Sequence, residues 1–197
     1  MENLFSDYKK LLNQRLDTKP LLLIGEDSIR YDFFYALTSN GVSSFEIEVE
    51  VPMDENCFIP RKNPIALRKE KPQIDLLVKS EKLQIAVEFG FFRENNNPKG
   101  TINKTAKAVK MFNDMLRLSL YKHFTTYPAY FICVADYKMI GHQMRNKYVG
   151  SFPSNYYITN EFIDHQLSQK CNMFDSRFVN KYKQLNIELT AKIVYNE

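Results

Sequence analysis

Cysteine and histidine are scarce in this chain, and the few that it has are scattered along it. The cysteines are Cys57, Cys133 and Cys171, and the histidines are His123, His142 and His165. Neither set shows the close spacing of ligands in a zinc site. The sequence therefore gives no support for zinc binding or for a catalytic Ser–His or Cys–His pair.

Long apolar runs are also missing, since none approaches the ~18 residues that a membrane span requires. The amino terminus, residues 1–7, lacks the basic and apolar regions of a secretory signal. We therefore expect a cytoplasmic protein without a membrane partner. Hydrophobic residues make up 44% of the 197 residues, which favours a single globular domain over residues 1–197. A net charge of +4 permits nucleic-acid binding but does not require it.

What the sequence does contain is a pair of acids, Asp75 and Glu88, in two adjacent apolar segments. The segments span residues 73–79 and 83–93, and a short polar break at 80–82 separates them. Both segments are short and rich in Ile, Val, Leu and Phe, which predicts two strands of a β-hairpin.

Strand alternation predicts the faces of this hairpin. In the second strand Leu83, Ile85, Val87 and Phe89 share one face, and Gln84, Ala86, Glu88 and Gly90 share the other. In the first strand Ile74, Leu76 and Val78 oppose Gln73, Asp75 and Leu77. Asp75 and Glu88 are then expected on the same side. Two carboxylates held close repel each other unless a cation joins them, and Mg²⁺ is the natural partner for such oxygens.

The sequence Pro72-Gln-Ile-Asp75 followed by Glu88-Phe-Gly90 resembles the core motif of the PD-(D/E)XK nuclease superfamily. The resemblance extends upstream, because residues 25–37 are similar to the first helix of these nucleases and residues 45–52 to the strand that follows. In total it covers roughly residues 21–137. It implies an α/β protein with the restriction-endonuclease-like fold, in which helices flank a mixed β-sheet.

The resemblance also implies a metal site. Asp75 and Glu88 would hold Mg²⁺, with Mn²⁺ as a substitute, and the backbone carbonyl of Phe89 would be a further ligand. Glu26 would add a carboxylate from the first helix, although an acid there also simply favours the helix dipole. Glu50 is a possible additional acid, one of three alternating glutamates with Glu46 and Glu48 whose face meets solvent or a cation.

The chain departs from the family at Gly90, which stands where the family has its catalytic lysine. That lysine lies next to the attacking water and stabilises charge in the transition state, which glycine cannot do. In some members it has moved to the following helix, so the resemblance implies Lys104 first and Lys107 second as the catalytic cation. Alternatively, the domain has lost catalysis and retains the fold for binding.

Basic residues flank the hairpin on both sides. Residues 52–72 contain several prolines and are predicted to form a long loop, which carries Arg61, Lys62, Arg68, Lys69 and Lys71. This loop is either simply solvated or touches phosphate. After the hairpin, a helix predicted over 102–123 carries Lys104, Lys107 and Lys110 near one face. That face is either solvated or points back at the acids, and Lys110 is a candidate contact to nucleic acid.

The remaining elements fit an α/β domain with a mixed sheet of about five strands. We predict further helices over 3–16, 26–39 and 161–170, and further strands over 45–51, 129–135, 156–159 and 185–194. The continuous apolar run at 129–135 indicates a buried central strand.

Three function classes follow. The first is a Mg²⁺-dependent DNA endonuclease of restriction or phage-defence type, which needs a homodimer or a partner subunit to cut both strands. The second is a catalytically inactive relative that binds nucleic acid or a protein partner. The third is an unrelated α/β protein in which Asp75 and Glu88 are surface acids without a shared role.

Overall fold

The computed structural model describes residues 1–60, 71–93, 104–135, 157–158, 160–185 and 191–192. Its helices are α1 (Glu2–Thr18), α2 (Glu26–Ser39), α3 (Lys104–Phe124), α5 (Asn160–Lys170) and α6 (Ser176–Gln184). Its strands are β1 (Ile47–Pro52), β2 (Gln73–Lys79), β3 (Gln84–Phe92), β4 (Ala129–Ala135), β5 (Tyr157–Ile158) and β6 (Ala191–Lys192). None of the described helices is long and apolar enough to cross a membrane.

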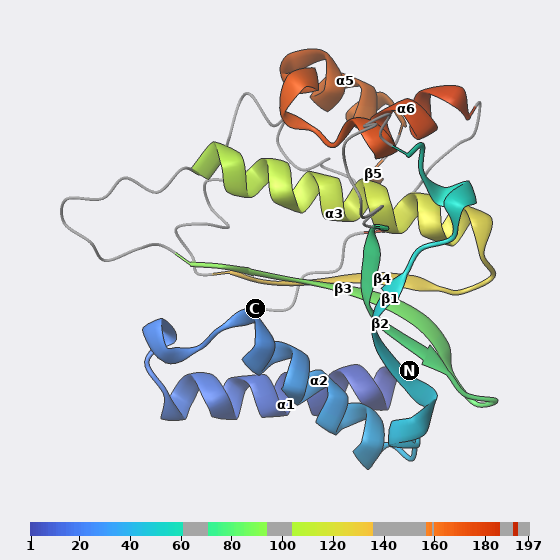
Figure 1. Ribbon diagram of the computed structural model, residues 1–197. Coiled ribbons are helices and arrows are strands. Elements are labelled where there is room, and N and C mark those ends of the chain that lie inside the picture. The colour runs from blue at the N-terminus through green and yellow to red at the C-terminus, as the bar shows by residue number, and fades with distance from the viewer. Residues whose placement is uncertain (61–70, 94–103, 136–156, 159, 186–190, 193–197) are drawn as a thin grey trace.

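The architecture is mixed α/β and layered. Helices α1 and α2 cover one face of the main sheet, α3 covers the other, and α5 and α6 lie beyond α3 (Figure 1). The main sheet has four strands in the order β1-β2-β3-β4. The first two pairs are antiparallel, and β4 runs parallel to β3. A parallel neighbour requires a crossover connection, and α3 lies in that connection.

Two apolar cores lie on opposite faces of this sheet. The α1–α2 core contains Ile29, Phe33 and Leu37 of α2 together with Leu76, Val78, Ile85, Val87 and Phe89 of the sheet. The α3 core contains Val109, Phe112, Leu116 and Leu120 of α3 together with Ile74, Leu77 and Ala86 of the sheet. Strands β2 and β3 are therefore covered on both faces. A polar side chain in either strand must find its partners inside the protein.

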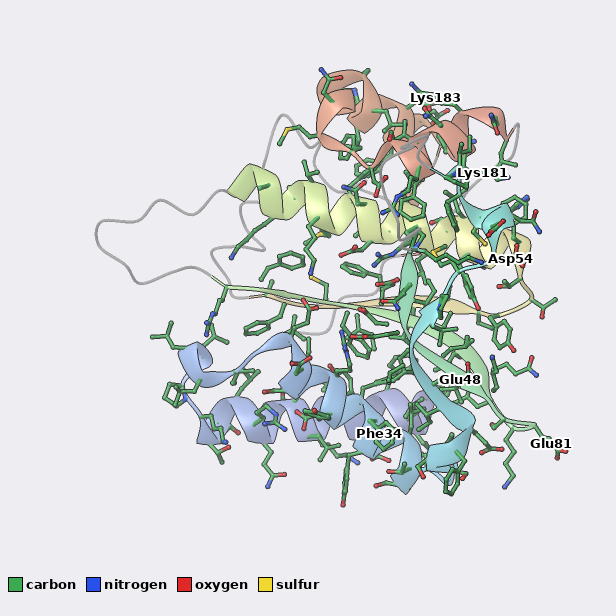
Figure 2. The ribbon with its side chains drawn as sticks, viewed as in Figure 1. Phe34, Glu48, Asp54, Glu81, Lys181 and Lys183 are labelled. Carbon is green, nitrogen blue, oxygen red and sulfur yellow. The ribbon has the colours of Figure 1, made fainter. Side chains whose placement is uncertain are left out.

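Most predicted elements are confirmed with small shifts at their ends. Helix α2 has the predicted bounds and ends at Ser39, and its C-cap Asn40 is followed by Gly41 with a φ of 86°. Positive φ is accessible to glycine, which suits it to the residue after a helix. Strand β2 also matches its prediction, and Figure 2 shows Glu81 at the tip of the hairpin that joins it to β3.

The predicted strand over 45–51 is shifted, because residues 44–46 form a 3-10 turn and the strand begins at Ile47. Glu46 therefore lies outside the strand, and the expected row of three glutamates on one face is wrong. Glu50 breaks the row again, because its φ of 52° lies outside the extended region. Residues that depart in this way bend a strand and change where its neighbours point.

The alternation predicted for β3 is confirmed, but that for β2 fails near Asp75. Ile74 was expected to oppose Leu77, yet both pack in the α3 core. Leu76, between them, packs in the α1–α2 core as expected. The failure lies opposite Glu50, since the β1–β2 ladder pairs residues on both sides of Glu50 and Asp75. The local bend at Glu50 is the physical reason.

The sheet itself also differs from expectation. Strand β4 ends the described sheet, next to β3 alone, so the prediction of a central strand for residues 129–135 is wrong. The expected burial is also only partial, because α3 and the α1–α2 layer pack against a half-buried strand in which Cys133 is exposed. The predicted strands over 156–159 and 185–194 lie largely outside the described residues, and within them β5 and β6 form a separate antiparallel pair. Helix α6 was not predicted.

Phe33 is the centre of the α1–α2 core and provides a test of this packing. Its ring is fully buried and meets the rings of Phe5, Tyr8 and Phe89 at centroid distances of 6.1, 5.2 and 5.6 Å. Phe33→Ala should lower the free energy of unfolding by about 3–5 kcal/mol in urea titrations. Tyr35→Ala, on the exposed side of the same helix, should change it by less than about 0.5 kcal/mol. Equal effects would contradict the core assignment.

Candidate metal and active site

The site lies where the β2–β3 ladder ends. The ladder pairs run from Lys79–Gln84 to Leu76–Val87, and Asp75 and Glu88 are the next residues on the two strands. Here the Asp75 side chain bonds to the neighbouring strand, since its Oδ2 accepts a hydrogen bond of 2.8 Å from Phe89 N. The two predicted acids are therefore neighbours on adjacent strands. Beyond the last ladder pair, the Asp75 side chain accepts a hydrogen bond from the β3 backbone.

Glu88 is buried, with a relative exposure of 1%. Its Oε2 accepts a short bond from Arg117 of α3, and Arg117 also donates to Asp114 Oδ1 at 3.1 Å. Its second oxygen, Oε1, has no hydrogen-bond partner within the described part of the chain. A glutamate so placed is not a chance surface acid, because burying an ionised carboxylate is costly without partners.

Burial raises the pKa of Glu88 to about 9, although the Arg117 guanidinium works in the opposite direction. The neighbouring charges of Asp75 and Asp114 raise it further. Burial also raises the pKa of Asp114 to about 6. Asp75 acts on both pKa values, so Asp75, Glu88 and Asp114 lie within one electrostatic cluster.

Asp75 bonds to a guanidinium from α2, whereas that of Glu88 comes from α3 on the other face of the sheet. The expectation that the two acids lie on the same side of the hairpin is therefore not confirmed. Arg30 of α2 donates to Asp75 Oδ1 at 3.3 Å, while its other terminal nitrogen lies 3.9 Å from carboxylate oxygens of Asp27 and Glu50. Glu50 is largely exposed and reaches the cluster through Arg30. The unusual φ of Glu50 lies beside this contact, and such residues are common where a strand is shaped around a site.

Glu26 joins the two helical layers. It is the first residue of α2, and its Oε2 accepts from Phe91 N at 3.4 Å and from Lys110 Nζ of α3 at 3.1 Å. A residue from α2 therefore meets a residue from α3 beside β3. This contact extends the cluster beyond Glu88 along the strand.

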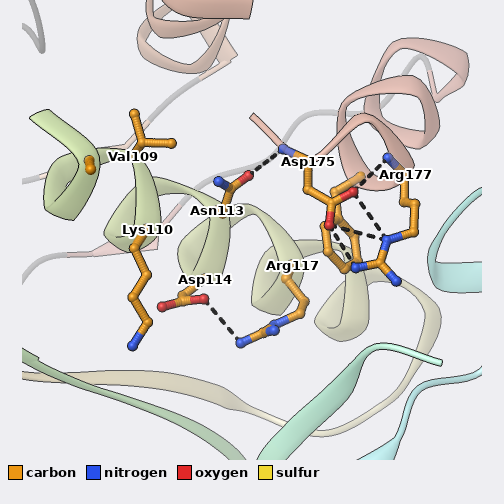
Figure 3. A pocket seen from close by; sticks show the side chains of 9 residues that line it. Val109, Lys110, Asn113, Asp114, Arg117, Asp175 and Arg177 are labelled. Atoms are coloured by element: carbon orange, nitrogen blue, oxygen red, sulfur yellow. Dashed lines mark hydrogen bonds and ion pairs between the residues drawn. The ribbon is translucent and has the colours of Figure 1, made fainter. Parts of the chain in front are cut away.

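One face of α3 supplies the cations. Lys107, Lys110, Asp114 and Arg117 follow one another at spacings of three or four residues, which places them on one side of a helix. Figure 3 shows Lys110, Asp114 and Arg117 projecting on this side. Lys107 donates to the carbonyl of Arg93 at 2.7 Å, beyond the end of β3. Of the α3 lysines with described side chains, Lys110 is therefore the one that reaches an acid of the cluster.

Gly90 is closely covered on the α3 side. A Cβ atom at this position would lie 2.6 Å from Phe92 Cε2 and 3.0 Å from Phe131 Cζ. Distances this short require the neighbours to move, and Phe92 is itself buried. The ring of Phe92 therefore fills the space where a side chain of residue 90 would begin.

The other predicted contacts are not brought together by the described structure. Arg61, Lys62, Arg68 and Lys69 fall in residues 61–70, which lie outside the described residues, and so does the side chain of Lys104. Lys71 pairs with Glu55 at 3.1 Å.

Sequence reasoning missed three residues of the cluster: Arg30, Asp114 and Arg117. Two of them, Asp114 and Arg117, left a signal. Arg117 and Asp114 follow Lys110 at helical spacing and interrupt an otherwise apolar stretch of α3, which indicates polar groups turned inward. Arg30 gave no comparable signal, because an arginine in a helix such as α2 is ordinarily a surface residue.

The cluster carries more carboxylates than cations, which bears on metal binding. Six acids, Glu26, Asp27, Glu50, Asp75, Glu88 and Asp114, surround three cations, Arg30, Lys110 and Arg117. No group of three or more His, Cys, Asp or Glu side chains within the described residues is arranged to hold a metal ion. The donor chemistry still fits a hard divalent cation, because carboxylates are in excess and one buried carboxylate oxygen, Glu88 Oε1, has no partner among the described residues.

Comparisons of the chain with protein-family models, with curated proteins and with solved structures found no match. The function must therefore be argued from the site itself.

The raised pKa of Glu88 predicts how stability changes with pH. The folded protein retains a proton on Glu88 that the unfolded chain releases above its ordinary value of 4.5, so stability falls as pH rises towards about 9. Between about pH 6.5 and 8.5, above the titration of Asp114, the free energy of unfolding of the wild type should fall by on the order of 1 kcal/mol per pH unit. Glu88→Gln should remove this dependence on pH. Urea titrations across this range measure it. The exposed control Glu48→Gln should keep the wild-type slope, and so would Glu88→Gln if burial imposed no penalty.

The crowding at Gly90 provides a second test. Gly90→Ala should lower the free energy of unfolding by about 1–3 kcal/mol, because the added methyl group overlaps the Phe92 ring. In a Phe92→Leu background, Gly90→Ala should lower the free energy of unfolding clearly less, because leucine leaves empty the space that the Phe92 ring occupies. Thermal and urea unfolding of the four proteins measure both steps. An undiminished cost in the Phe92→Leu background would show that the ring is not the obstacle.

Proposed function

We propose that this protein is a Mg²⁺-dependent endonuclease that hydrolyses phosphodiester bonds of DNA, of restriction or phage-defence type. The observation that carries this proposal is that Asp75 bonds to Phe89 N and Glu26 to Phe91 N, which places both acids along β3 just beyond Glu88. The order of helix, strand, acidic hairpin, long helix and parallel strand supports it, because a restriction-endonuclease-like fold has this order by the resemblance already described.

Asp75, Glu88 and Glu26 would hold the metal ion, together with the backbone carbonyl of Phe89. When bound there, a divalent cation supplies an activated water and relieves negative charge on the phosphate. The protein prepares this site before any ion enters. Phe89 N orients the Asp75 carboxylate, Arg30 fixes its other oxygen, and Phe91 N holds Glu26 beside β3.

Lys110 is our candidate for the cation that replaces the missing lysine of the motif. Its ammonium lies 3.1 Å from Glu26 and is half exposed, so it can approach a phosphate beside the acids. Lys107 is a weaker candidate than its sequence position implied, because it bonds to the Arg93 carbonyl. Lys104 begins the same helix and stays a candidate.

Nucleic acid would approach the cluster along its basic surroundings. Lys110 and the basic segment with Arg61, Lys62, Arg68, Lys69 and Lys71 are the proposed phosphate contacts, since basic side chains dominate affinity for nucleic acid. Cutting both strands of a duplex requires two such sites. A homodimer or a partner subunit is therefore part of the proposal.

A catalytically inactive domain that binds nucleic acid or a protein partner is the second candidate. Two observations favour it. The Phe92 ring occupies the position of the motif lysine, and Arg117 already bonds to Glu88. An inactive relative would retain the fold and this buried bond without needing a metal ion.

Cleavage of plasmid DNA with Mg²⁺ or Mn²⁺ tests the first candidate. Asp75→Asn should abolish both cleavage and calorimetric binding of Mn²⁺, because it removes a ligand charge yet can still accept from Phe89 N. Lys110→Met should lower turnover by about 100-fold, on the order of 3 kcal/mol in the barrier, with a small effect on DNA affinity.

The matched controls remove the same charges elsewhere. Asp17→Asn changes an exposed acid near the end of α1, and Lys183→Met changes an exposed lysine on the outer side of α6 (Figure 2). Both should behave as wild type. Wild-type protein that binds DNA but cuts neither DNA nor RNA with either ion would favour the second candidate.

A further inference from the structure

Arg117 is shared between two acids on different elements. The same terminal nitrogen donates to Glu88 of β3 and to Asp114 of its own helix. Asp114 lies one turn before Arg117 on α3, so this second contact does not depend on the sheet. If the bond to Glu88 is lost, Arg117 retains a carboxylate partner nearby.

The bond between Arg117 and Glu88 leaves polar atoms unsatisfied on both sides. Among the described residues, neither Glu88 Oε1 nor Arg117 Nε, both fully buried atoms, has a hydrogen-bond partner. A buried ion pair with incomplete hydrogen bonding recovers little of the cost of removing its charges from water. Little free energy therefore opposes the movement of Arg117 from Glu88 to another partner.

Space for a second position of Arg117 lies beside it. An open cleft of about 360 Å³ lies between α3 and α6 and is lined by Lys110, Asn113, Asp114, Arg117, Asp175 and Arg177, among others. In Figure 3, Asp114 and Arg117 project from α3 on one side, and Asp175 and Arg177 face them from the other. A guanidinium that left Glu88 would enter this cleft without displacing the apolar core.

We propose that Arg117 is a gate on the metal site: it occupies Glu88 in the metal-free protein and moves to Asp114 and the α3–α6 cleft when a divalent cation binds Glu88. This inference rests on the proposed metal site and describes its regulation. A cation and the guanidinium compete for one buried carboxylate, so metal affinity is set by how firmly Arg117 is held.

Calorimetric titration of the full chain with Mn²⁺ tests the gate. Arg117→Met removes the competitor and should raise the affinity for Mn²⁺ at least tenfold. Lys122→Met removes the same charge from an exposed position at the far end of α3 and should leave the affinity unchanged. Thermal unfolding of each variant establishes that it is folded before titration.

Asp114→Asn provides an independent arm that keeps Arg117 in place. Without its second partner, Arg117 is held on Glu88 alone, and Mn²⁺ affinity should fall several-fold. In an Arg117→Met background the same substitution should have little effect, because the competitor is already absent.

The outcomes distinguish a failure of the proposed role of Arg117 from a failure of the proposed metal site. Equal Mn²⁺ affinity in wild type and Arg117→Met, or an Asp114→Asn effect that is the same in both backgrounds, would overturn the gate and leave the metal site standing. Absence of Mn²⁺ binding in every folded variant would overturn the metal site, and the gate with it.

Discussion

The burial of one carboxylate is the constraint on which the rest of this site depends. Glu88 lies in a strand that is covered on both faces, and its side chain is almost entirely removed from water. A charge in that position requires a partner from the covering layer, and α3 supplies Arg117. Arg117 in turn is shared with Asp114, which explains why a polar stripe runs through the inward face of an amphipathic helix.

The two cores hold the rest of the cluster in place. Phe33 and its aromatic neighbours fix α2 against the sheet, and α2 carries Glu26 and Arg30 to the end of the β2–β3 ladder. On the other face of the sheet, the apolar side chains of α3 pack in the core and so fix the positions of Lys110 and Arg117 relative to the sheet. Acids from strands and helices thus meet cations from helices on rigid elements, which is the arrangement that a preorganised site requires.

Much of the fold could be predicted because it follows local periodicity. Helix α2 and strand β2 were bounded by apolar spacing alone, and the faces of β3 followed from simple alternation in a regular ladder. Alternation failed at Ile74 because Glu50, on the neighbouring strand, adopts a positive φ that no sequence pattern announces. The position of β4 at the end of the described sheet was likewise a matter of tertiary contacts, since an apolar run reports burial and not strand order.

The site was predictable in its acids but not in its cations. Asp75, Glu88 and Glu26 were found from their places in the hairpin and first helix, and the structure brings them to one cluster. Choosing among the lysines of α3 required the rotation of that helix about its axis, which tertiary packing decides. This rotation directs Lys110 to Glu26 and Lys107 to the Arg93 carbonyl. Arg30 could not have been found, because Glu50 and Asp75, the strand residues that it joins, lie far from it in the sequence.

The central claim is that Asp75 and Glu88 share a divalent cation. Anomalous diffraction from crystals grown with Mn²⁺ tests it most directly, because it locates the ion and the side chains together. We expect an anomalous peak bonded to both carboxylates, with Arg117 withdrawn from Glu88. Crystals without a peak between these carboxylates, in which Arg117 still bonds to Glu88, would contradict it.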